Sequence, residues 1–127
     1  MPSPVRALVA ALVSVSVASA QDTRAPEAYQ LAIGLQQRGL HEEAVRRFEE
    51  FLQANPRHAL AAEGHYRLAQ SLVELQQAPA AMRALSAALQ VGGAQFRLQA
   101  EARYRLAELQ LQAGQHEAAA ASFEQLE

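Results

Sequence analysis

Side chains that could carry out catalysis are few and scattered in this chain of 127 residues. The chain has no cysteine, which excludes a thiolate nucleophile, a thiolate metal site and a disulfide. A serine nucleophile is typically held in a sharp glycine-flanked turn beside a base, whereas Ser71, Ser86 and Ser122 fall within helical patterns. The other serines lie in the first twenty residues. The sequence therefore predicts no catalytic residue and no enzyme.

The four histidines are the remaining candidates for a metal site. No two of them are spaced i, i+4, the spacing that places two imidazoles on one face of a helix. His41 and His116 each follow a glycine by two residues, and we interpret both as surface or half-packed positions. We expect neither a metal site nor a cofactor.

The charge balance is weakly negative. There are 13 acidic and 11 basic residues, a net charge of −2, and every basic residue is an arginine. A chain that binds nucleic acid or anionic lipid by charge needs a basic surface. This composition therefore provides no electrostatic argument for either partner.

Residues 1–20 have the pattern of a secretory signal peptide. They carry a single charge, Arg6, followed by an apolar run over 8–13 and the small residues Ala18-Ser19-Ala20. We expect cleavage near Ala20 and export to the periplasm or the medium, with 21–25 as a short polar lead-in. The alternative is a membrane anchor. The apolar run is shorter than the roughly 20 residues that a span needs, so we expect no stable anchor after cleavage.

The rest of the chain repeats itself. Tyr29, Tyr66 and Tyr104 are 37 and then 38 residues apart, and each is followed by Leu-Ala two residues later. A small residue and then a large one recur further on, as Ala44 and Phe48, Ala81 and Leu85, Ala119 and Phe123. Self-similarity at this period is typical of a solenoid, in which each unit covers the apolar face of its neighbour.

Each repeat contains two helical patterns bounded by turn residues. Pro26 suits the first turn of a helix, Gly39 suits a left-handed cap, and Asn55-Pro56 suits a stop. We expect six helices with no strand, an all-α antiparallel array, at about 26–38, 42–54, 59–76, 79–91, 96–113 and from 116 to the end.

These repeats resemble tetratricopeptide repeats, paired antiparallel helices that stack into a right-handed superhelix. The resemblance implies a right-handed α-solenoid of three helix pairs, at about 26–58, 59–94 and 95–127. The first unit matches the family pattern most fully, with Leu31, Ala32, Leu35, Gly39, Ala44, Phe48 and Pro56. Gln76 stands where the family has a turn glycine, and Gly93 where it has a final proline. With its long spacing and signal peptide, the chain is similar to exported repeat proteins of the bacterial envelope, such as the periplasmic partner of the Tol–Pal system.

In this family the first helix of each pair lines a groove, which implies a protein or peptide partner. The positions that match the family's groove are Tyr29, Ile33, Gln36, Tyr66, Gln70, Val73, Tyr104, Glu108 and Leu111. The tyrosines can instead pack against the next unit, and both roles are compatible. We therefore expect an exported scaffold without catalysis. Two alternatives remain open: a module that self-associates through its uncapped C-terminal helix, and the N-terminal, non-catalytic arm of a longer protein or enzyme.

Overall fold

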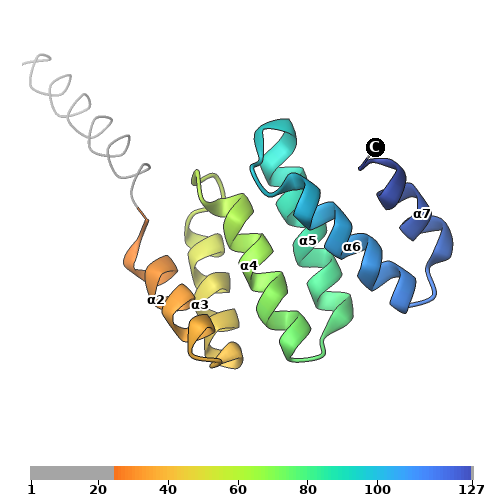
Figure 1. Ribbon diagram of the computed structural model, residues 1–127. Coiled ribbons are helices and arrows are strands. Elements are labelled where there is room, and N and C mark those ends of the chain that lie inside the picture. The colour runs from red at the N-terminus through yellow and green to blue at the C-terminus, as the bar shows by residue number, and fades with distance from the viewer. Residues whose placement is uncertain (1–24, 127) are drawn as a thin grey trace, which may run out of the picture.

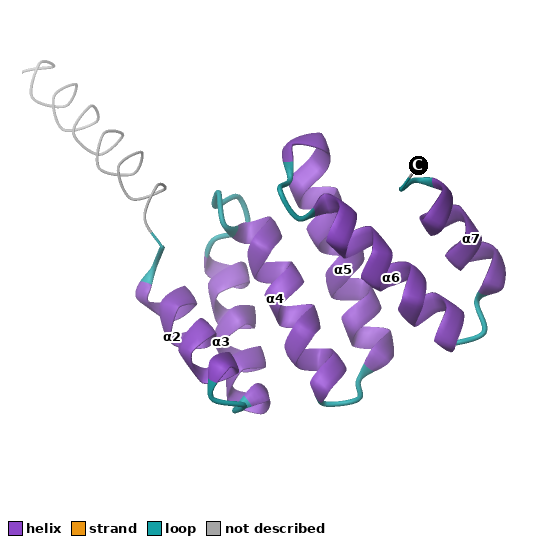
Figure 2. Cartoon of the chain, viewed as in Figure 1, coloured by secondary structure: helices purple, strands orange, loops and turns teal. Residues whose placement is uncertain are grey.

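The computed structural model describes residues 25–126, and all structural statements below concern this range. The predicted signal peptide and most of the lead-in lie outside it. The described chain is entirely helical (Figures 1 and 2). Its elements are α2 (Glu27–Gln37), α3 (His41–Ala54), α4 (Ala61–Glu74), α5 (Ala78–Gly92), the 3₁₀ helix η1 (Gly93–Gln95), α6 (Gln99–Gln112) and α7 (His116–Glu124).

The six α-helices form a row in chain order (Figure 1). Each packs on the helix before it and the helix after it, and α2 also contacts α4 across the first pair. First helices α2, α4 and α6 alternate with second helices α3, α5 and α7 along the row. The fold is therefore an α-solenoid of three helix pairs, as the repeat predicted.

The turn inside each pair has the same backbone geometry. Gly39, Gln76 and Gly114 have φ angles of 79°, 59° and 79°, in the left-handed region. The next residue in each turn donates its N–H to the carbonyl five residues back, at 2.9, 2.9 and 2.8 Å. The left-handed residue donates three residues back, at 3.0, 2.9 and 3.1 Å. This pattern of bonds is the Schellman motif, and it confirms the predicted cap at Gly39.

The connections between pairs differ from one another. After α3, the Asn55 side chain donates to the Phe51 carbonyl at 3.1 Å, and His58 Nδ1 accepts the Leu60 N–H at 3.0 Å. After α5, Gly93 has a φ of 61° and begins η1, which the sequence did not predict.

Two predicted helix limits are wrong. Helix α6 begins three residues after Phe96, because Phe96 is extended, with a ψ of 119°. Helix α7 ends at Glu124 and does not run to the end of the chain.

Small residues bring the helices close together. Ala32 and Ala44 in the first pair are completely buried, as are Ala81 and Ala107 in the later pairs. A Cβ at Gly64 would lie 3.2 Å from Leu52 Cδ2, so α4 lies directly on α3. Large side chains fill the remaining space, as close packing requires.

No helix in the described part of the chain is long and apolar enough to cross a membrane.

Candidate functional site

The nine predicted groove residues lie on the first helices of the pairs, three each on α2, α4 and α6. The structure gives the three sets very different environments. Those on α2 are buried, half-buried or bonded to other parts of the fold, those on α4 line a hollow, and those on α6 include the exposed Tyr104 and Leu111.

On α4, the three predicted residues meet in one place. Tyr66, Gln70 and Val73 line a hollow of about 220 Å³ between α4, α5 and α6. Gln70 is exposed, whereas Tyr66 and Val73 are half-buried and pack against the core. Arg105 of α6 completes the wall, together with Glu74, Ala69 and Leu85. The hollow thus combines apolar surface with an amide, a phenol and two opposite charges.

On α2, Tyr29 is only 2% exposed, which leaves almost no surface for a ligand. Its ring lies 5.0 Å from the ring of Phe51 and 5.9 Å from that of Phe48, centre to centre. Its hydroxyl donates a hydrogen bond to Glu63 of α4. Tyr29 therefore packs against the next unit, which is the alternative that the sequence left open for the tyrosines.

The Glu63 carboxylate joins three parts of the solenoid. Besides the bond from Tyr29, Arg97 Nη2 donates to its Oε1 at 2.8 Å, and Arg67 Nε lies 3.5 Å from its Oε2. Burial by itself would raise the pKa of Glu63. The hydrogen bond from Tyr29, the charge of Arg67 and the hydrogen bond from Arg97 together outweigh burial and hold this pKa below its usual value of 4.5. Burial and the bond to Glu63 raise the pKa of Tyr29.

Gln36 of α2 is also bound to the next unit. Its amide nitrogen lies 2.7 Å from the Arg67 carbonyl and 2.8 Å from Ser71 Oγ. Ser71 is fully buried, and its hydroxyl is also 3.1 Å from His41 Nδ1. Ile33, the third predicted residue on α2, is half-buried against the core. These contacts explain why α2 has little free polar surface toward α4.

On α6, Tyr104 and Leu111 are 51% and 49% exposed. The Tyr104 ring makes an edge-to-face contact with Phe123 of α7, with centroids 6.0 Å apart. Glu108 accepts a hydrogen bond from Arg105 at 3.1 Å, which orients the arginine that closes the hollow on α4. The third unit therefore presents aromatic and aliphatic surface to its surroundings.

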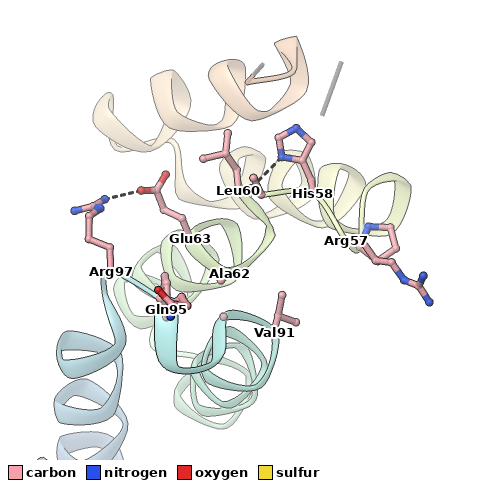
Figure 3. A pocket seen from close by; sticks show the side chains of 12 residues that line it. Arg57, His58, Leu60, Ala62, Glu63, Val91, Gln95 and Arg97 are labelled. Atoms are coloured by element: carbon pink, nitrogen blue, oxygen red, sulfur yellow. Dashed lines mark hydrogen bonds and ion pairs between the residues drawn. The ribbon is translucent and has the colours of Figure 1, made fainter. Parts of the chain in front are cut away.

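A second, larger hollow of about 680 Å³ lies where the connections between pairs meet (Figure 3). Arg57 and His58 come from the first connection, Val91 from the last turn of α5, and Gln95 and Arg97 from the second connection. The sequence did not predict this hollow. Pro56 and Gly93 marked the two connections, but only stacking of the pairs places them at the same edge.

The described residues contain no group of three or more histidine, aspartate or glutamate side chains placed to hold a metal ion. His65 is half-buried on α4, and burial lowers its pKa below the usual 6.5.

Residues 66–127 match the model of the tetratricopeptide repeat family. That match covers most of the second unit and all of the third, including the hollow on α4 and the exposed face of α6. No curated protein and no solved structure matches the chain.

Proposed function

We propose that this protein is a scaffold that binds a protein or peptide partner along α4 and α6, with the hollow on α4 as its anchor point. Tetratricopeptide repeats generally mediate protein–protein interaction and are typically non-catalytic. The observation that carries the proposal is the hollow itself, where Tyr66, Gln70 and Val73 meet Arg105 from the next unit.

The chemistry of the hollow suits a peptide segment with one apolar side chain. Val73 and Leu85 provide an apolar floor, and Tyr66 offers both ring surface and a hydroxyl. Interface anchors are enriched in such aromatic residues and in arginine. The exposed amide of Gln70 at the rim can bond to a backbone N–H or C=O of an extended partner.

The partner would extend from the hollow toward α6, where Tyr104 and Leu111 are exposed. It would find little to bind on α2, since Tyr29 and Gln36 are already bound to α4. The binding surface in this proposal is therefore narrower than the nine-residue groove expected from the family.

Site-specific crosslinking tests the proposal. A photo-reactive residue at Gln70, in the chain expressed in its host, should give one dominant adduct with another protein. The same residue at Arg83, exposed on α5, is the matched control. Val73→Arg, which fills the hollow with charge, should abolish the Gln70 adduct. Adducts only with itself, or none above the Arg83 control, would refute binding in this hollow.

We further propose that the scaffold acts outside the cytoplasm, on the basis of the signal-like pattern of residues 1–20. The narrower likeness to periplasmic Tol–Pal proteins has no support from the comparisons. Mass spectrometry of the chain recovered from fractionated host cells tests export. A first residue at Gln21, in the periplasm or medium, is the expected result; an intact N-terminus in the cytoplasm would contradict it.

A further inference from the structure

The two ends of the solenoid expose side chains whose equivalents in the other units are buried or half-buried. On the last pair, the trailing face consists of Tyr104, Leu111 and Phe123. Tyr104 is 51% exposed, whereas its equivalent Tyr29 is 2% exposed beneath α4. Phe123 is half-buried, whereas its equivalents Phe48 and Leu85 are fully buried. No described residue follows to cover this face.

The first pair also exposes an apolar side chain, on the side of the pair that faces away from the rest of the solenoid. Its leading face consists of Leu31 and Gly34 on α2. Leu31 is 48% exposed, although the equivalent leucines, Leu68 and Leu106, are each 8% exposed. A Cβ at Gly34 would have no atom within 4 Å, whereas the equivalent Ser71 has no exposed surface.

The contact between the first two pairs is the template for how such faces meet. There, the trailing face of the first pair supplies Gln36 and His41, which both bond to Ser71 on the leading face of the second. In repeat register, Leu111 and His116 stand where Gln36 and His41 stand, and Gly34 stands where Ser71 stands. The trailing face of the last pair therefore corresponds to the surface with which the first pair contacts the second, except that Leu111 replaces the amide of Gln36.

We propose that the trailing face of one copy binds the leading face of a second copy, in continuation of the solenoid. Leu111 and Tyr104 of one chain would cover Leu31 of the next, and Gly34 would leave room for the leucine side chain. Because the two faces are different surfaces, the contact is heterologous and adds copies in one direction. Burial of exposed apolar side chains supplies the driving force.

Two variants that each disable one face test the arrangement. Leu31→Glu places a charge on the leading face, and Leu111→Arg places one on the trailing face. The full chain should show a mass that rises with concentration in sedimentation velocity, and each variant alone should stay monomeric. A mixture of the two variants should form a one-to-one dimer and nothing larger, since each retains one intact face.

Val91→Glu is the matched control. Val91 is 47% exposed but lies at the hollow between the connections, away from both faces. This variant should assemble like the parent, and circular dichroism should give all three variants the helix content of the parent.

Three results would overturn the proposal. They are a monomeric parent chain at every concentration, a mixture of variants that stays monomeric, and self-association of Leu31→Glu through like faces. The Gln70 adduct should persist in Leu31→Glu, so failure of stacking and failure of partner binding are separable.

Discussion

Replacement of Gln76 by glycine should stabilise the protein. Gln76 occupies the left-handed position of the turn between α4 and α5, with a φ of 59°, where the other two pairs have glycine at 79°. Both hydrogen bonds of the turn, from Gln76 N–H to Val73 O and from Gln77 N–H to Leu72 O, are 2.9 Å. The side chain itself is exposed. The substitution therefore changes backbone strain and removes no buried contact.

The expected gain follows from two opposing effects. A residue with a Cβ pays about 1–2 kcal/mol to adopt the left-handed conformation. Glycine avoids that cost but loses about 0.5–1 kcal/mol more chain entropy on folding. The net stabilisation of Gln76→Gly should be about 0.5–1 kcal/mol, equivalent to a rise of roughly 2–8 °C in the unfolding midpoint for a domain of this size.

Urea unfolding followed by circular dichroism at 222 nm measures this change, and the slope against urea should stay constant. Gly39→Ala and Gly114→Ala are the reciprocal controls and should each destabilise the protein by about 1 kcal/mol. An unchanged or lower free energy of unfolding for Gln76→Gly, with both controls behaving as expected, would refute the idea that this turn is strained.

Three further outcomes are expected. Stability should fall as the pH is lowered from 7 to below 4.5. The first loss begins below pH 6.5, because burial disfavours the charged form of His65 in the folded protein. The second begins below pH 4.5, because the unfolded chain takes up a proton at Glu63 before the folded protein does; Glu63→Gln should remove only this second loss, measured in urea titrations at each pH. Gly92→Ala should cost about 1–3 kcal/mol in the same assay, because its Cβ would lie 2.5 Å from Phe96 Cβ. Phe48→Ala should cost about 3–5 kcal/mol, because the ring is fully buried against Tyr29; a loss under 1 kcal/mol would contradict that packing.

Local signals in the sequence were enough to predict the helix pairs. The turn glycines and the paired small and large residues report on neighbours within three or four residues, and helix formation depends mainly on these. The left-handed cap predicted at Gly39 is correct, and Gly114 adopts the same conformation. Gln76 had no such signal, and only the backbone shows that it adopts the same conformation.

The candidate site was only partly predictable. The spacing of Tyr66, Gln70 and Val73 predicted that they share one face of a helix. The structure shows that Arg105 of α6 lines the same hollow from the opposite side. Glu63 and Arg97, 34 residues apart, form an ion pair that no periodicity indicated. The hollow between the connections was missed for the same reason, since it depends on how successive pairs stack.

The sequence by itself determined that the chain repeats, that it is helical and which residues make each pair close-packed. These properties arise from contacts within a repeat. Only the tertiary structure decided what each repeated residue does. Tyr29 and Tyr104 hold the same motif position, yet one is buried and bound to Glu63 while the other is half exposed. The physical reason is that burial at this position depends on whether another helix pair lies against it, and a residue's own motif carries no information about that.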